Sequence, residues 1–178
     1  MARNYHTFDV IILGGGTAGL TALKEVLKYT SNAILVNDGP LGTTCIRTAC
    51  MPSKSFIHGA NLMHSFRKMC KADLMKKKHQ LEMDIPQLLN RVRDLREHFM
   101  EAIMKEYESV RDYIIDGRAT FETPTCVRLE DKRLLHAKSI IVATGSSPTI
   151  PDGFEGVSDH RLFLPEPAAN YCPEHQIL

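Results

Sequence analysis

The sequence of 178 residues has no strong excess of charge of either sign and no long hydrophobic run. Its 22 lysine and arginine residues nearly balance 21 aspartate and glutamate residues, which gives a formal net charge of +1. This balance implies no bulk attraction to nucleic acid or to membranes, so we predict neither as a partner. No apolar stretch approaches the length of a membrane span, and the polar start Met1–Thr7 leaves no room for a signal peptide. We therefore expect a cytoplasmic location.

The chain has no internal repeat and no low-complexity segment, and its composition is that of one globular domain. Hydrophobic residues make up 43% and charged residues 24%, which is ordinary for a folded protein of this length. We predict that the folded domain covers residues 1–150. Residues 151–178 are rich in proline, glycine and acidic side chains, and we predict that they form a linker.

Cysteine is present in an odd number, without a secretion signal. This argues against a framework of structural disulfides and for a reducing compartment, where a paired dithiol is more often catalytic than structural. Zinc is a poor alternative, because the spacing is wrong and no histidine pair completes a site, so we predict no metal site. The five residues are Cys45, Cys50, Cys70, Cys126 and Cys172.

A glycine-rich turn follows the first predicted strand, residues 8–13, and precedes a predicted helix over residues 20–30. With a second predicted strand after that helix, Gly-x-Gly-x-x-Gly is a strong indication of a dinucleotide site. Gly14 is expected to permit a tight turn, Gly16 to let a pyrophosphate approach the backbone, and Gly19 to let helix and strand pack closely. The pyrophosphate would rest on the helix N-terminus, where free N–H groups and the helix dipole favour an anion.

Two cysteines with four residues between them, Cys45 and Cys50, follow a glycine turn and precede a Pro-Ser-Lys sequence. On a regular α-helix their Cα atoms would lie about 8 to 9 Å apart, whereas a disulfide needs less than about 7 Å. If the thiols pair, the first helical turn must therefore be distorted, and Pro52 helps because it removes the hydrogen bond to the carbonyl of Thr48. A helix N-terminus would also favour the thiolate. A redox pair and two buried, reduced structural cysteines are both compatible with this run.

The remaining segments alternate between helical and strand patterns. A helix with a basic C-terminal end is expected over residues 55–79, and a second helix begins after Asp84, which resembles a capping box with Gln87. The apolar stripe of the second helix is either core or a partner-facing surface. It consists of Ile85, Leu88, Leu89, Val92, Leu95, Phe99, Ile103 and Tyr107. Further strands are predicted at residues 33–36, 113–115, 119–122, 127–129 and 134–136, followed by a buried strand at 139–143.

Three motifs, in this order, resemble those of the FAD-dependent pyridine nucleotide–disulfide oxidoreductases. They are Gly14-x-Gly16-x-x-Gly19, then Gly42-Thr43-Thr44-Cys45-x-x-x-x-Cys50-x-Pro52-Ser53-Lys54, then Ala143-Thr144-Gly145. The branch that the chain looks most like contains dihydrolipoamide dehydrogenase and mercuric reductase. The resemblance implies an α/β fold, an incomplete Rossmann-like FAD-binding domain in three layers with a parallel sheet and a β-meander.

The resemblance also implies FAD as the cofactor and a dithiol or disulfide as the substrate. Cys50 would exchange electrons with the flavin, and Cys45 would be the interchange thiol that attacks the substrate disulfide. The flavin would lie beside this pair, with Lys54 near its ring. The implied cofactor-binding residues are Gly14, Gly16, Thr17, Ala18, Gly19, Asn37, Asp38, Gly42, Thr43, Thr44, Lys54, Ala119, Ala143, Thr144 and Gly145.

The chain departs from the family pattern at two places. The family usually has a glutamate at the end of the second strand, where this chain has Asn37 followed by Asp38. The family's Cys-x-Asn-x-Gly-Cys contains Arg47 and Ala49 here. We hypothesise that Arg47 favours thiolate formation and shifts the substrate preference, while Ala49 replaces a glycine that eases the distorted turn.

Some of the family's parts are missing from the 178 residues. There is no second Gly-x-Gly-x-x-Gly for a nicotinamide domain and no dimerisation domain with its His-Glu acid–base pair. We therefore expect an N-terminal fragment, inactive alone, whose linker leads toward an NAD-binding domain. NAD(H), a lipoamide-like disulfide substrate and a homodimer are expected of the full-length parent. The main alternative is a dinucleotide-binding module with non-catalytic cysteines, and a plain NAD-binding dehydrogenase is less favoured.

Overall fold

The computed structural model describes residues 5–74, 82–146 and 152, which fall into two compact units. The first, here called the sheet unit, includes residues 5–43 and 102–146. The second, here called the hairpin unit, includes residues 44–74 and 82–101. Helix α4 (Ile85–Glu108) contributes residues to both units.

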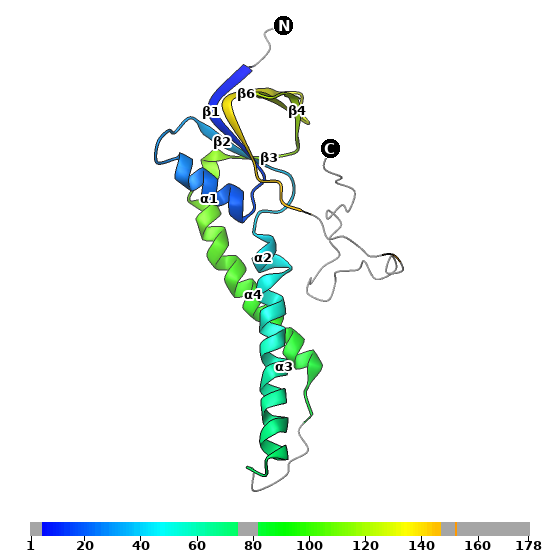
Figure 1. Ribbon diagram of the computed structural model, residues 1–178. Coiled ribbons are helices and arrows are strands. Elements are labelled where there is room, and N and C mark those ends of the chain that lie inside the picture. Colours follow the sequence, from blue (N-terminus) through cyan, green and yellow to red (C-terminus); the bar gives the residue numbers. More distant parts are fainter. Residues whose placement is uncertain (1–4, 75–81, 147–151, 153–178) are drawn as a thin grey trace. The chain divides into compact units, whose positions relative to one another are not determined.

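The sheet unit contains one six-stranded sheet in the order β3-β2-β1-β6-β5-β4 (Figure 1). Strands β3, β2, β1 and β6 are parallel to one another, whereas β6, β5 and β4 form an antiparallel meander. The strands are β1 (Tyr5–Leu13), β2 (Ala33–Asn37), β3 (Ile114–Asp116), β4 (Ala119–Thr123), β5 (Cys126–Leu129) and β6 (Leu134–Val142). The predicted α/β fold with a parallel sheet and a meander is confirmed.

The alternation of side chains along β1 places the core on both faces of the sheet. Ile12 packs with Leu23 of helix α1 (Thr17–Val26) and with the last turn of α4. Ile11, which points to the opposite face, packs with Val127 of β5 and Leu135 of β6. Each of these side chains is almost fully buried, and such burial stabilises by roughly 1.5–3 kcal/mol per side chain. Helices, parallel strands and meander therefore form three layers.

Strand β6 differs from the prediction. Two separate strands were predicted, at residues 134–136 and 139–143, and the second was expected to be buried. It runs without interruption because its pairing with β1 continues from Leu134 to Val142. Its second half is not buried, since Val142 is 61% exposed. The reason is that β5 pairs with β6 only as far as His136, and no described strand flanks β6 beyond that point on this side.

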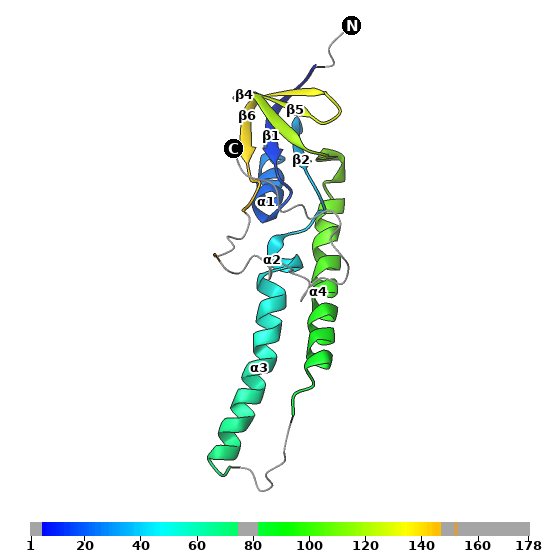
Figure 2. The same cartoon turned by 90° about the vertical axis from the view of Figure 1, so that its right-hand side faces the viewer.

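In the hairpin unit, α3 (Cys50–Lys71) lies beside α4 in both views (Figures 1 and 2). The two helices approach closely at Gly59, where an added Cβ atom would lie 2.5 Å from the Cδ1 atom of Leu88. Helix α3 begins earlier than the predicted start at residue 55, because Pro52 stands in the first turn, where an N–H has no intrahelical partner. The predicted basic end at residues 76–79 lies outside the described residues.

The start of α4 is confirmed, since the Gln87 N–H donates to Asp84 Oδ1 at 2.9 Å. Two residues of the apolar stripe, Val92 and Tyr107, are almost fully buried, whereas Ile85 is exposed and the other five are partly buried. Arg96 is also buried on this side, which the apolar pattern did not predict. None of the helices in the described part of the chain is both long enough and apolar enough to cross a bilayer.

Candidate dinucleotide and dithiol sites

Two of the three motif glycines have no room for a side chain. Gly14 has φ +103°, and an added Cβ atom would lie 2.3 Å from the carbonyl oxygen of Ala143. A Cβ atom at Gly19 would lie 1.8 Å from the carbonyl oxygen of Gly14. The Ala143 N–H donates to the carbonyl of Leu13 at 2.8 Å. The roles predicted for Gly14 and Gly19 are confirmed, and the structure brings the first and third motifs into direct contact.

The third motif glycine, Gly16, faces open space. No atom lies within 4 Å of a Cβ atom built there. Gly16 caps α1 without a side-chain hydrogen bond, and the first turn of α1 contains no acidic residue. The unpartnered N–H groups and the helix dipole favour an anion at this end. These features fit the pyrophosphate of a dinucleotide.

The segments that follow four parallel strands meet at one edge of the sheet. The Gly14 N–H, after β1, donates to the carbonyl of Val36 in β2, and the Gly117 N–H, after β3, donates to the carbonyl of Asn37. Ala143 follows β6 and contacts Gly14. Ala119, one of the implied cofactor-binding residues, begins β4 two positions after Gly117 and is half-buried. Ligands bind at this carboxyl edge in open α/β sheets.

Asn37 has a role in the protein itself that the sequence did not predict. Its side chain is buried, with Oδ1 accepting the Gly15 N–H at 2.8 Å and Nδ2 donating to the carbonyl of Gly39 at 2.7 Å. A Cβ atom at Gly15 would lie 2.7 Å from Asn37 Oδ1, which explains a third consecutive glycine in the turn. Cofactor binding by Asn37 or by the exposed Asp38 stays a prediction.

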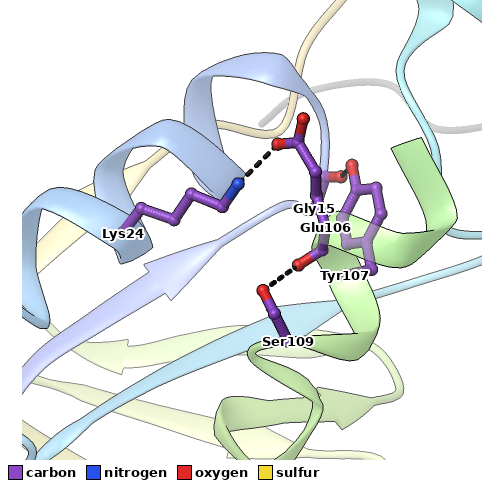
Figure 3. Close-up of polar contacts among 5 residues, drawn as sticks. All are labelled: Gly15, Lys24, Glu106, Tyr107 and Ser109. Carbon is purple, nitrogen blue, oxygen red and sulfur yellow. Dashed lines mark hydrogen bonds and ion pairs between the residues drawn. The ribbon is translucent and has the colours of Figure 1, made fainter. Parts of the chain in front are cut away.

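Tyr107 also contacts the glycine turn, and the sequence indicated it only as a stripe residue. Its buried hydroxyl donates to the carbonyl of Gly15 (Figure 3). The neighbouring Glu106 forms an ion pair with Lys24 of α1, and its carbonyl accepts the Ser109 hydroxyl at 2.7 Å (Figure 3). A buried tyrosine usually forms a hydrogen bond through its hydroxyl. A tyrosine at the end of the apolar stripe was therefore the one signal in the sequence for a polar contact there.

The thiol run folds as two helices separated by a break. Helix α2 (Thr44–Arg47) ends before Thr48, and Cys50 is the first residue of α3. Between them Ala49 has φ −119° and ψ −92°, and its N–H donates to the carbonyl of Thr44, five residues back, at 2.9 Å. The predicted distortion is confirmed. Since φ of Ala49 is negative, the turn does not need the family's glycine at this position.

The break brings the two thiols into contact, and both are free cysteines in this structure. The hydrogen bond between the side chains of Cys45 and Cys50 raises the pKa of Cys45, and burial and the charge of Cys50 act in the same direction. The charge of Lys54 and the N–H of Cys50 lower the pKa of Cys45, although they do not reverse the shift. The net result is a raised pKa, so the Cys45 thiol persists to higher pH than that of an ordinary cysteine.

The profile of the pyridine nucleotide-disulphide oxidoreductase family matches residues 8–171. The chain belongs to this family. The matched segment contains the glycine turn, the thiol pair and the Ala-Thr-Gly segment. Family membership agrees with the resemblance drawn from these three motifs.

Relatives in this family include enzymes of different substrate specificity. The chain is 26% identical to mercuric reductase of Lysinibacillus sphaericus, over 83% of the chain and 27% of the relative. It is 29% identical to dihydrolipoyl dehydrogenase 1, mitochondrial, of Arabidopsis thaliana, over 78% of the chain and 28% of the relative. Glutathione reductase of a Nostoc species is 24% identical, over 88% of the chain and 34% of the relative. The chain thus spans about a third or less of these relatives.

The fold has a counterpart among solved structures. The HOCl-induced flavoprotein disulfide reductase RclA from Escherichia coli superposes with a TM-score of 0.60 over 82% of this chain and 30% of RclA. At 21% sequence identity, this likeness supports the fold alone.

The family's site residues are divided between the two units. Cys45, Cys50, Lys54 and the exposed Thr44 lie in the hairpin unit. The sheet unit contains the rest: Gly14, Gly16, Thr17, Ala18, Gly19, Asn37, Asp38, Gly42, Thr43, Ala119, Ala143, Thr144 and Gly145. Contacts at the glycine turn join Gly14, Gly19, Asn37 and Ala143. Cys45 interacts with Cys50 and Lys54 in the hairpin unit. Cofactor binding by the predicted residues stays a prediction.

The cation that lowers the pKa of Cys45 is Lys54, whereas the sequence hypothesis named Arg47. Arg47 is the last residue of α2, and its proposed effect on substrate preference stays a prediction. Lys54 stands one turn into α3 from Cys50 and is exposed. The charge of Lys54 thus opposes the rise in the pKa of Cys45, and the hypothesis that Arg47 favours thiolate formation stays a prediction.

Replacing Lys54 with methionine should slow alkylation of Cys45 at neutral pH. Without the positive charge the pKa of Cys45 rises further, so less thiolate is present and the rate profile moves to higher pH. The effect should be modest, because solvent and salt screen exposed charges. Iodoacetamide labelling of Cys45, followed by peptide mass spectrometry across pH, measures the shift. Lys71→Met, at the far end of α3, is the control, and identical profiles for both variants would contradict this role.

A groove of about 430 Å³ lies between α3 and α4 within the hairpin unit. Four leucine and valine side chains line it, together with three groups that carry or can acquire positive charge. The lining side chains include Leu62, Leu88, Val92 and Leu95, with Lys54, His58 and Arg91. Such a lining suits a ligand with a substantial apolar part.

Cys126 differs from the thiol pair in its surroundings. Cys126 is buried in β5, and burial, followed by the charge of Glu122, raises the pKa of its thiol. Its Sγ lies 3.6 Å from Nε2 of His136. Cys126 thus has the character of a poor nucleophile.

No group of three histidine, cysteine or acidic residues able to hold a metal occurs in the part of the chain that the structure describes.

Proposed function

We propose that this chain binds FAD at the carboxyl edge of its sheet and that its Cys45–Cys50 pair cycles between dithiol and disulfide. The observation that carries the proposal is the interrupted helix, which brings the two thiols into contact in a member of a disulfide oxidoreductase family. FAD, when bound, supplies a two-electron donor and acceptor to this pair. Cys50 exchanges electrons with the flavin.

Cys45 is the interchange thiol. As a thiolate it attacks one sulfur of the substrate disulfide, forming a mixed disulfide and releasing the first substrate thiol. Cys50 then attacks the Cys45 sulfur, which forms the Cys45–Cys50 disulfide and releases the second thiol. Two cysteine thiols and one disulfide become one cysteine disulfide and two thiols, so two electrons and two protons pass to the substrate. Because its pKa is raised, Cys45 must lose its proton before it attacks, and the charge of Lys54 favours that loss.

The substrate and partners proposed for the whole protein follow from its relatives. We propose a lipoamide-like disulfide, NAD(H) as the electron source and a homodimer, with Lys54 beside the flavin ring. The apolar groove in the hairpin unit supports a substrate with an apolar chain. We further propose that the 178 residues do not turn over alone, since they contain a single Gly-x-Gly-x-x-Gly. The domain boundary at residue 150 and the cytoplasmic location stay predictions.

The chain should bind added FAD and show no steady-state diaphorase activity with NADH. The open space at Gly16 and the uncapped start of α1 provide the anion site, whereas nothing among the proposed residues supplies electrons from NADH. Isothermal titration with FAD and a dye-reduction assay measure the two properties. Absence of any FAD binding would overturn the cofactor proposal, and robust turnover would overturn the proposed dependence on further parts.

A further inference from the structure

Gly15, the middle residue of the three consecutive glycines, is held at both its N–H and its C=O. The N–H donates to Asn37 Oδ1 at 2.8 Å, and the carbonyl accepts the Tyr107 hydroxyl. Asn37 comes from the end of β2, and Tyr107 comes from the last turn of α4, 92 residues further along the chain than Gly15 (Figure 3). Both side chains are buried, so neither hydrogen bond is open to competition from water.

The orientation of the Asn37 amide is itself determined by a second contact. Its Nδ2 donates to the carbonyl of Gly39 at 2.7 Å, which leaves Oδ1 directed at Gly15. An aspartate could not make the donor contact, because an ionised carboxylate only accepts hydrogen bonds. The amide at the end of β2 therefore supplies both the acceptor for Gly15 and the donor for Gly39.

The contact of Tyr107 determines where the next N–H points. In a planar trans peptide the C=O of one residue and the N–H of the next point in opposite directions. The Gly15 carbonyl is drawn toward the core by Tyr107, so the Gly16 N–H is directed away from the core. No described group accepts a hydrogen bond from this N–H, and the space at Gly16 is open.

The ion pair between Lys24 and Glu106 ties α1 to α4 beside this contact (Figure 3). The ion pair is exposed and therefore contributes little stability. It nevertheless joins α1, which begins at the glycine turn, to α4, whose last turn contacts the glycine turn through Tyr107. The Ser109 hydroxyl donates to the carbonyl of Glu106 and completes the last turn of α4. These contacts thus fix the position of the end of α4, which carries Tyr107, relative to α1 and the glycine turn.

We propose that Tyr107, assisted by Asn37, is a positioning residue that turns the Gly16 N–H outward as a donor to the pyrophosphate of a bound dinucleotide. The inference rests on the proposed function. Without the Tyr107 hydroxyl, the Gly15–Gly16 peptide loses the contact that holds its carbonyl inward, and the Gly16 N–H is no longer presented in one direction. The effect is confined to ligands that contain the phosphates.

Tyr107→Phe tests the proposal, because it removes one oxygen atom and keeps the ring in the core. We expect the affinity for ADP to fall about tenfold, the loss typical of one buried hydrogen bond to a backbone group, with little change for adenosine. Titration calorimetry with ADP, adenosine and FAD measures this ratio. Tyr113→Phe, which removes the same oxygen atom from another tyrosine of the sheet unit, is the matched control. If Tyr107 serves only the core, the variant will melt earlier and keep the ADP-to-adenosine ratio, which overturns the proposal.

A second measurement uses the unaltered chain and does not depend on the folding of a variant. Saturating ADP should shift the amide resonance of Gly16 and slow its exchange with solvent, whereas adenosine should do neither. If ADP binds and the Gly16 amide does not respond, the positioning role is wrong while the proposed cofactor stands. If the unaltered chain binds neither ADP nor FAD, the proposed function fails and the positioning role fails with it.

Discussion

Replacing either Cys45 or Cys50 with serine should abolish the oxidisable pair and, in any complete enzyme, disulfide reduction. Mild oxidation of the unaltered chain should protect two thiols and leave three of its five cysteines reactive. The break at Ala49 already places the two sulfurs in contact, so closing the bond requires little movement of the backbone. Either serine variant should retain all four remaining thiols after the same treatment. Thiol titration counts the free thiols of the unaltered chain and of each serine variant. Intact-mass measurement detects the loss of two hydrogens when a disulfide forms.

Cys70→Ser is the control for the thiol experiment. Cys70 lies in α3 near its C-terminal end and is partly buried. Its removal should leave the protection of Cys45 and Cys50 intact. If the unaltered chain loses no thiols on oxidation, or loses a different pair, the cysteines are not a redox pair and the chain is better described as a binding module with inert cysteines.

Replacing Gly19 with alanine should destabilise the sheet unit severely. A Cβ atom there would lie 1.8 Å from the carbonyl oxygen of Gly14, a backbone atom that cannot move away without shifting the whole turn. Alanine would gain about 1 kcal/mol in helix propensity, but overpacking of this kind costs about 3 kcal/mol or more. Since a domain is stable by only about 5–15 kcal/mol, the loss is large. Urea denaturation followed by circular dichroism measures it.

Gly16→Ala separates folding from binding at the same turn. A Cβ atom there meets nothing within 4 Å, and φ of Gly16 is −78°, so the variant should fold with nearly unchanged stability. The added methyl group would nevertheless occupy the open space beside the Gly16 N–H, and the affinity for ADP and FAD should fall. Equal stability of Gly19→Ala and Gly16→Ala would contradict the close contact between Gly19 and Gly14. Undiminished FAD binding by Gly16→Ala would place the pyrophosphate elsewhere.

The features that the sequence predicted correctly depend on neighbouring residues. The turn at Gly14 to Gly19 follows from a strand pattern, three spaced glycines and a helix pattern. The break between Cys45 and Cys50 follows from the length of a disulfide and the geometry of one helical turn. Each of these can be judged from short-range sterics and hydrogen bonding, which the local residue types determine.

The features that the sequence did not predict depend on residues far apart in the chain. The Tyr107 hydroxyl reaches Gly15 across 92 residues, and β6 continues past its antiparallel partner because β1 pairs along its whole length. Asn37 was interpreted as a cofactor-binding residue at the position of the family's glutamate, yet its amide forms hydrogen bonds with Gly15 and Gly39. The sequence alone therefore determined the strand, glycine turn and helix that form the proposed anion site, and the distortion that any pairing of Cys45 with Cys50 requires. Only the packing of β2 and α4 against that loop decided how its peptide groups are oriented, because hydrogen-bond partners are chosen by proximity in space.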